Sequence, residues 1–206
     1  MKNITILGLI LLSLIIVSCA DSSTNPASKN DSYYPLAVGN SWEYIIEGYV
    51  FDGEDYELKQ DTFSLEIISS SLYYEDYMYQ FGHDGEPFEI WPIYMWSNDT
   101  LFTAIMDIEP ILAQNMKKGD SIVYEDEGDY WSYRKVTLVE DTDTELTVNG
   151  HKYSDVAVLK TTVTETENDS TTVEINRSYY AKGVGLIKGD LWILGPTTLL
   201  NYHIEN

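Results

Sequence analysis

The side chains with the most obvious chemical potential in this sequence are carboxylates gathered in three short clusters. The clusters are Asp52-Gly-Glu-Asp55, Glu125-Asp-Glu-Gly-Asp129 and Asp141-Thr-Asp-Thr-Glu145. Ca²⁺ takes about six to eight oxygen ligands, and acidic loops can supply several of them. None of the clusters follows the EF-hand order, because the position that requires Gly after Glu145 holds Leu146. We therefore expect solvated acidic loops, with no metal site and no cofactor.

The other reactive residues lack the spacing of known catalytic or metal sites. The sequence has no Gly-x-Ser-x-Gly nucleophile elbow, and no Ser-x-x-Lys motif accompanied by its companion motifs. Its three histidines, His83, His151 and His203, lie far apart in the sequence and do not have metal-ligand spacing. We expect no catalytic residues and interpret the chain as a non-enzymatic protein.

A hydrophobic segment near the N-terminus ends at the single cysteine of the chain, Cys19. Lys2 precedes an apolar run from Ile4 to Val17, which is the pattern of a secretory signal peptide. This run is too short for a bilayer-spanning helix, which needs about 20 residues. A lone cysteine also excludes internal disulfides and a cysteine-based metal cluster. The segment therefore predicts export of the chain.

The residues around that cysteine, Ile16-Val17-Ser18-Cys19, resemble the lipobox of bacterial lipoproteins. The resemblance implies that residues 1–18 are removed as a signal peptide and that Cys19 is lipidated and becomes the first residue. Several acyl chains hold a protein on a membrane durably, at about 0.8 kcal/mol per buried CH₂. Ala20, and not Asp, follows the cysteine, which by enterobacterial sorting rules favours the outer membrane. Which face of the membrane carries the protein, and whether the host has one membrane or two, stay open.

The rest of the chain divides into a short tether and one folded region. Residues 19–32 contain no large apolar side chain that burial could use to offset ordering entropy, so we expect a flexible tether. Residues 33–206 are expected to form a single β-rich domain. The 12 Lys and Arg against 34 Asp and Glu give a net charge of −22. This charge argues against nucleic acid as a partner and against docking of the folded region on anionic lipid.

Alternating apolar and polar residues predict β-strands along most of the folded region, because a period of two places one set of side chains on a buried face. The clearest apolar sets are Trp42, Tyr44 and Ile46; Phe63, Leu65 and Ile67; and Val173 and Ile175. The sequence shows neither heptads nor alternation of strands with helices. The predicted fold class is all-β with minor α: an antiparallel curved sheet of about ten strands, forming a partly closed barrel or a sandwich.

Turn residues fix some of the connections between these strands. Asn149-Gly150 predicts a two-residue hairpin that sets Val148 against His151 and Leu146 against Tyr153, since Asn and Gly both tolerate positive φ. A second turn is expected within residues 167–170. Residues 109–119 predict a short helix, with Pro near its start and Lys-Lys-Gly at its end. Gly119-Asp120-Ser121 repeats the pattern of Gly39-Asn40-Ser41. Coincidence or convergent turn chemistry is favoured here over duplication of a β half-unit.

Two longer segments resemble parts of a group of bacterial lipoproteins of unknown function. Residues 33–44 match the pattern aromatic-Pro-Leu-x-x-Gly-Asn-x-Trp-x-Tyr that opens those proteins, and residues 177–188 are similar to their late Gly-Val-Gly-Leu-Ile-Lys segment. Residues 148–156 are similar to the hairpin before a long strand in the same proteins. The resemblance implies a β-rich envelope protein and supplies no catalytic residue. Gly183 and Gly185 independently suggest a bulge or a close backbone approach.

Three functions compete on this reading. The first is a lipid-anchored, non-enzymatic cell-envelope protein with a binding or structural role and an unidentified ligand, for which an envelope protein, a glycan and an apolar ligand are the candidates. The second is a LolA-like carrier of lipid or another apolar ligand, which requires an open apolar cavity. The third is a glycan-binding module or carbohydrate-active protein that uses exposed aromatic rings. The candidate rings are Tyr73, Tyr74, Tyr77, Tyr79, Phe81, Trp91, Tyr94 and Trp96, for which packing in a β core is the favoured interpretation.

Overall fold

In the part of the chain that the structure describes, the regular structure is a single antiparallel sheet of thirteen strands. The computed structural model describes residues 32–51, 56–73, 76–83, 86–87, 93–97, 100–104, 108–190 and 196–205. The strands are β1 (Ser41–Phe51), β2 (Tyr56–Tyr73), β3 (Asp76–His83), β4 (Glu86–Pro87), β5 (Ile93–Ser97), β6 (Thr100–Ala104), β7 (Ile108–Ala113), β8 (Ser121–Gly128), β9 (Trp131–Val148), β10 (His151–Glu167), β11 (Ser170–Ala181), β12 (Gly185–Asp190) and β13 (Pro196–His203). The predicted all-β, antiparallel fold class is confirmed.

The strand order divides the sheet into two meanders. Neighbours follow the order β7-β6-β5-β3-β2-β1-β13-β12-β11-β10-β9-β8, and β4 pairs with β3. Each meander runs through consecutive strands, and the first strand of the chain, β1, pairs with the last, β13. The order would close a ring if β7 paired with β8. Among the described residues no such ladder exists, so the sheet stays open and does not form a barrel.

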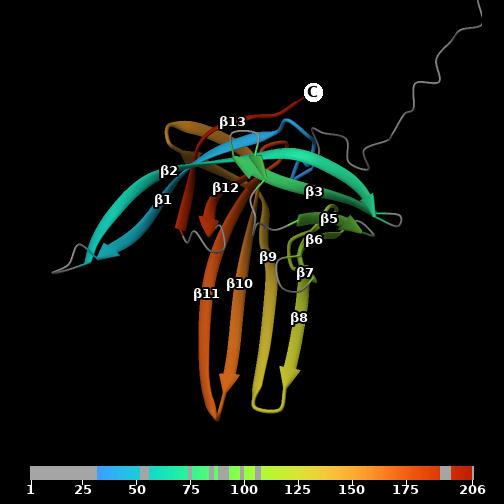
Figure 1. Cartoon of the computed structure of the whole chain (residues 1–206), viewed down its shortest axis with the longest axis vertical. Coiled ribbons are helices and arrows are strands. Elements are labelled where there is room, and N and C mark those ends of the chain that lie inside the picture. The colour runs from blue at the N-terminus through green and yellow to red at the C-terminus, as the bar shows by residue number, and fades with distance from the viewer. Residues whose placement is uncertain are drawn as a thin grey trace, which may run out of the picture.

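The two halves of the sheet differ in shape (Figure 1). Strands β8 to β11 run side by side as two long hairpins that project away from the rest of the molecule, while β1, β2 and β3 arch across their other end. β9 has 18 residues and β10 has 17, well above the typical strand length of about five or six. We call the projecting part, residues 121–138 and 160–177, the blade.

The hydrophobic core lies where the arch crosses the upper ends of the blade strands. Trp42 and Tyr44 of β1 and Leu65 and Ile67 of β2 are all buried, as their alternation predicted. The Trp42 ring lies 6.2 Å from the ring of Tyr34 and 6.3 Å from that of Phe81, centroid to centroid. Aromatic rings at such spacing add packing energy beyond their buried area.

The predicted helix over residues 109–119 is wrong. This segment contains the edge strand β7, followed by two turns. Pro110 pairs with Phe102 beside an irregularity of the ladder, and an edge strand at a bulge is where a sheet tolerates proline. A helix of barely two turns gains too few hydrogen bonds to offset the cost of its first turn, so pairing with β6 prevails.

Both predicted hairpin turns are present. Asn149 and Gly150 have φ of 47° and 81°, and the ladder pairs Val148 with His151 and Leu146 with Tyr153 as expected. The turn predicted within 167–170 also has two residues, since Glu167 pairs with Ser170. Asn168 and Asp169 both have positive φ there. The described part of the chain contains no long apolar helix of the kind that crosses a membrane.

One prediction about side-chain placement is wrong. Val173 and Ile175 lie on a strand, as their alternation indicated, but they are 58% and 55% exposed. The reason is that β11 leaves the core below Tyr179 and continues into the blade, where no second layer covers it. The alternation of apolar and polar residues on β11 therefore indicates that the two faces of the sheet differ in polarity, but it does not indicate that either face is buried.

Candidate functional site

Residues 33–44 and 177–188, the two longer segments singled out in the sequence, meet in space and form one structural joint. The indole Nε1–H of Trp42 donates a hydrogen bond to the backbone oxygen of Val184, at 2.6 Å. The hydroxyl of Tyr44 donates to the backbone oxygen of Leu186, at 3.1 Å. A Cβ at Gly185 would lie only 3.3 Å from Trp42 Nε1, which confirms the predicted close approach. These residues are buried in the core, so their spacing serves packing.

Asn40 is the polar centre of this joint, a role that the sequence did not reveal beyond a turn. Its side chain is fully buried and donates to the backbone oxygen of Pro35 at 2.6 Å. Its Oδ1 accepts the backbone N–H of Glu205 at 2.9 Å, near the other end of the chain. Ser32, the last residue of the predicted tether, is also buried. Its backbone oxygen accepts a hydrogen bond from the N–H of Gly183 at 2.8 Å.

The described acidic clusters do not converge on a common point. Along β8, Glu125 and Glu127 lie on one face of the sheet and Asp126 on the other, because side chains alternate along a strand. In the third cluster, Asp141 lies 3.7 Å from Lys118, and Glu145 lies 2.6 Å from Lys152. In the described part of the chain, no group of three or more His, Cys, Asp or Glu residues could hold a metal ion. The first cluster, Asp52–Asp55, lies outside the described residues.

The histidines occupy unrelated positions. His151 is exposed beside its turn, and His203 on β13 pairs with Glu205 at 3.2 Å. His83 belongs to β3, but its side chain lies outside the description, as do residues 1–31 with Cys19.

The predicted aromatic set belongs largely to the core where it is described. Tyr79 and Phe81 are buried and Tyr77 packs against the core cluster. The side chains of Tyr73, Tyr74, Trp91, Tyr94 and Trp96 lie outside the described residues. Two other aromatics are exposed at the tip of the blade: Tyr130 by 78% and Trp131 by 45%. A Cβ on Gly128 would overlap the indole of Trp131, so this ring covers the glycine across the hairpin.

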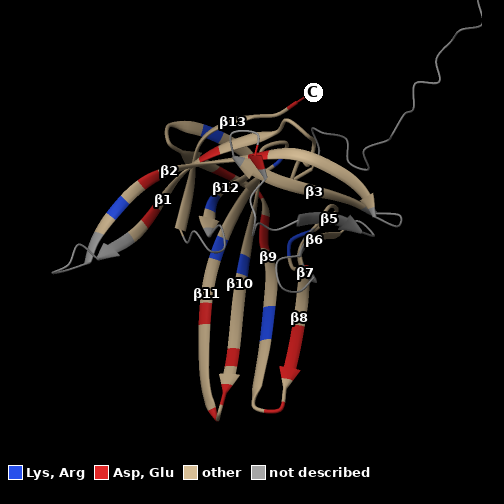
Figure 2. Ribbon diagram, viewed as in Figure 1, with Lys and Arg blue, Asp and Glu red and all other residues tan. Residues whose placement is uncertain are grey.

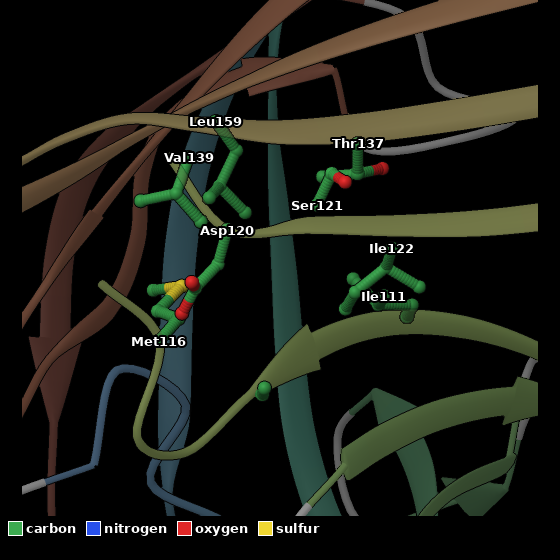
Figure 3. A pocket seen from close by; sticks show the side chains of 9 residues that line it. Ile111, Met116, Asp120, Ser121, Ile122, Thr137, Val139 and Leu159 are labelled. Carbon is green, nitrogen blue, oxygen red and sulfur yellow. The ribbon is translucent and has the colours of Figure 1, made fainter. Parts of the chain in front are cut away.

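An apolar recess lies at the open seam between β7 and β8 (Figure 3). Its lining comes from both sides of the seam, including Ile111 of β7, Ile122 of β8, Met116 between them, and Val139 and Leu159 behind. The cavity volume is about 20 Å³, which is room for about one water molecule. A site for a drug-sized ligand needs about 300–1,000 Å³, so this recess gives the carrier hypothesis no support.

The blade presents two faces that differ in charge. One face, which we call face A, carries every second residue of each blade strand: Ser121, Val123, Glu125, Glu127, Ser132, Arg134, Val136, Leu138, Lys160, Thr162, Thr164, Thr166, Thr171, Val173, Ile175 and Arg177. Glu140, just beyond the blade on β9, contacts Arg177 on this face. Face B carries the alternate residues, from Ile122 and Tyr124 on β8 to Glu174 and Asn176 on β11. Figure 2 shows acidic residues toward the tips of β8 and β10 and basic residues nearer the body on β10 and β11, whereas on β9 the order is reversed.

Two ion pairs connect strands of the sheet on face A. Arg134 Nε lies 2.7 Å from Glu125 Oε1. Arg177 bonds both carboxylate oxygens of Glu140, at 2.6 and 3.1 Å. This hydrogen-bonded contact lowers the pKa of the Glu140 carboxyl and raises that of Arg177. Exposed pairs of this kind contribute little to stability individually, so their main effect is on the charge pattern of the face.

Comparison with known protein families and with curated proteins finds no match for this sequence. Among solved structures, the fold resembles that of a protein described as "a putative lipoprotein from Parabacteroides distasonis ATCC 8503", determined at 2.70 Å. The two chains are 12% identical, the TM-score is 0.43, and the match covers 84% of this chain and 99% of that one. At this level of similarity the match says nothing about activity or ligands.

Proposed function

We propose that this protein is a lipid-anchored component of the bacterial cell envelope with a non-enzymatic, binding or structural role. The observation that supports the proposal most is the lipobox-like Ile16-Val17-Ser18-Cys19, which precedes a short polar segment and then the body. The body is fixed from Ser32 onward by the N–H of Gly183. The intervening residues, at about 5–6 Å × √n, give the body a typical reach of about 20 Å from the lipid.

The blade is the part of the body that we assign to binding. Its strands extend beyond the core, and apart from Thr137, near β7, its side chains are exposed or half-buried. Extended surfaces of this kind suit recognition of a partner molecule, whereas a catalytic site of the usual kind requires a concave pocket. We place the protein on the outer membrane, following the residues after Cys19.

Acyl labelling tests the anchor directly. Cells producing the full chain are fed an alkyne-tagged fatty acid, and the protein is probed by click chemistry and intact mass. We expect the native chain to carry the label and to fractionate with membranes, and the Cys19→Ser variant to lose both properties. Ser18→Ala is the matched control and should retain them. Equal membrane retention and an unchanged mass for Cys19→Ser would refute the anchor.

A second candidate, glycan binding, is favoured by the exposed aromatic pair at the blade tip. The ring of Trp131 lies against Gly128 and is 45% exposed, so its exposed side can receive the apolar face of a sugar ring, with Tyr130 beside it in sequence. Titration with envelope oligosaccharides should quench tryptophan fluorescence in the native chain and not in Trp131→Leu. Tyr202→Leu, which removes another exposed ring, is the control. No quenching with any oligosaccharide would exclude this candidate.

A further inference from the structure

A row of mostly apolar side chains crosses face A, and we call it the apolar row. Val123, Val136 and Ile175 lie in register on β8, β9 and β11, with the polar Thr162 between them on β10, and Val173 lies two residues nearer the hairpin tip on β11. Val123 is 46% exposed, and Val173 and Ile175 are exposed still further. A single exposed valine is explained by the high β-strand propensity of this residue. Several exposed apolar side chains gathered on one face are, in contrast, typical of an interaction site.

The charges around this row cancel, which is unusual for a chain with a net charge of −22. Face A carries three acidic residues (Glu125, Glu127, Glu140) and three basic ones (Arg134, Lys160, Arg177). Both arginines of the sequence are among them. Face B, by contrast, carries four acidic residues and one basic residue: Asp126, Glu165, Glu167, Glu174 and Lys135. Face A is therefore the side of the blade on which two copies of the protein can approach without net repulsion.

The charges of face A are also distributed unevenly between its corners. Glu125, Glu127 and Arg134 lie at the tip of the β8 side and sum to −1. Lys160, Arg177 and Glu140 lie near the body on the β10–β11 side and sum to +1. These two corners are diagonally opposite across the apolar row. A two-fold axis in the contact plane, perpendicular to this diagonal, brings each acidic corner against a basic corner.

We propose that face A is a self-association surface, on which a second copy of this chain docks face to face about such a two-fold axis. The apolar rows of the two copies pack against each other at the centre, and two symmetric sets of opposite charges lie at the rim. The contact is isologous, which is the commonest geometry of homodimers. Sheets packed with their strands crossing steeply form one of the two known classes of sheet-on-sheet packing.

Other ways for two copies to meet are less favourable. Pairing two β8 edges would place the acidic residues Glu125, Asp126 and Glu127 of both copies close together. Packing two B faces would oppose net charges of −3, from one basic and four acidic residues on each. Like charges in direct opposition cost several kcal/mol at an interface. The proposal goes beyond the envelope function and does not depend on the lipid anchor.

Neighbouring residues on β11 provide a matched test. The full chain, purified as the host produces it, is examined by native mass spectrometry over a range of protein concentrations. We expect a monomer–dimer equilibrium for the native chain. Ile175→Glu should be monomeric, whereas Asn176→Glu, which adds the same charge to face B, should still form dimers. A native chain that stays monomeric at all concentrations, or Ile175→Glu that dimerises normally, would overturn the proposal.

A charge exchange tests the arrangement without touching the apolar row. Glu127→Lys and Lys160→Glu should each weaken dimerisation by about tenfold, because each places like charges at both rim contacts. The double variant should recover most of the loss, since it restores opposite charges in reversed positions. Circular dichroism verifies that each variant is folded. If the two effects simply add, the charged corners do not face each other, and the two-fold arrangement is wrong.

Discussion

The two lipoprotein-like segments show how single residues hold distant parts of this chain together. Trp42 satisfies its indole N–H with the backbone of Val184, and Asn40 connects Pro35 with Glu205. A buried polar group that loses its partner costs the full desolvation penalty, which is about 1–3 kcal/mol. Residues such as Asn40 and Trp42 are therefore required by the fold, and the pattern of residues 33–44 is explained by packing and hydrogen bonding.

Substitution of Asn40 by alanine should destabilise the protein strongly. The change leaves the oxygen of Pro35 and the N–H of Glu205 buried without their partner. We expect the free energy of unfolding to fall by about 2–4 kcal/mol, measured by urea denaturation. Asn115→Ala, at an exposed position, serves as the control and should change it by less than about 0.5 kcal/mol. Equal effects of the two substitutions would contradict the role of Asn40.

Tyr79 should make stability depend on pH in alkaline solution. Burial, with a smaller contribution from Tyr77, raises the pKa of its phenol from 10.0 to about 12. Between these values the unfolded chain loses the proton and the folded chain keeps it, so stability is complete below pH 10 and falls as pH rises. The loss is on the order of 2 kcal/mol.

The contribution of Tyr79 is measured by comparing how steeply the free energy of unfolding falls with pH in the native chain and in Tyr79→Phe. Burial also raises the pKa of Tyr33 and Tyr153, so the native chain loses stability through several groups. The free energy of unfolding of Tyr79→Phe should fall less steeply between pH 10 and 12 than that of the native chain. Parallel curves for the two proteins would refute the prediction.

The sequence alone predicted the burial of single residues well where the alternation within one strand determines it. Trp42, Tyr44, Leu65 and Ile67 are buried as their alternation indicated. Ile175 shows the limit of this inference, because alternation indicates that the two faces differ but does not show what covers either of them. The partners of Asn40 could not be predicted, since they lie five and 165 residues away and depend on the whole fold.

At the scale of elements, the two meanders begin with the same turn. Gly39 and Gly119 have φ of 92° and 93°, and each lies in a turn closed by the next residue, Asn40 or Asp120. Each turn also bonds both ways with a core strand, through Ile67 in the first meander and Val139 in the second. The match between Gly39-Asn40-Ser41 and Gly119-Asp120-Ser121 therefore reflects a shared turn geometry at the start of β1 and β8.

Gly119 offers a clean test of that turn. Neither Gly119 nor Gly48 has any atom within 4 Å of the position where a Cβ would be added, but only Gly119 has positive φ. We expect Gly119→Ala to lower the free energy of unfolding by about 1–2 kcal/mol because of backbone strain. Gly48→Ala, on β1, should be neutral or slightly stabilising. The midpoints of thermal or urea unfolding decide between them, and a neutral Gly119→Ala would show that the turn relaxes.

Element type was predictable from sequence only where local and global preferences agree. The Asn149-Gly150 hairpin is set by its own two residues, and its register followed directly. Residues 109–119 have helix-like ends, but their side chains gain more from a neighbouring strand than from a short helix. The length of β9 and β10 was also not predictable, because no turn signal shows where an exposed strand leaves the core.

For the whole molecule, the dominant electrostatic feature is its negative charge. A net charge of −22 spread over a thin, extended sheet makes the folded chain repel itself. The repulsion between exposed groups is screened beyond about 10 Å at 0.1 M salt. Ion pairs such as Arg177 with Glu140 offset only a small part of this repulsion.

Stability should therefore increase with ionic strength. We expect the melting temperature to rise by several degrees as sodium chloride increases from low to physiological concentration. Calorimetry of the native chain checks this expectation, with sucrose at matched osmolality as the control for effects other than screening. A melting temperature that falls with salt would show that the ion pairs, and not the excess of carboxylates, dominate.

The arrangement of the whole sheet could not be predicted from sequence. Hairpins between consecutive strands follow from turn signals, but nothing local indicates that β1 pairs with β13. The pairing arises because each meander leaves one strand edge and one set of apolar side chains open, and the two edges satisfy each other. Sequence also did not show whether the sheet closes; among the described residues no ladder joins β7 to β8, so it is not closed into a barrel.

This pairing of first and last strands also bears on how the protein is made. While the ribosome is still translating, β1 has only β2 beside it, because its other neighbour, β13, follows all the other strands along the chain. Leu199, in the core, and Glu205, the partner of Asn40, are likewise added after those strands. The sheet is thus completed only when β13 has left the ribosome. A stop codon before Pro196 would leave β1 unpaired along one side.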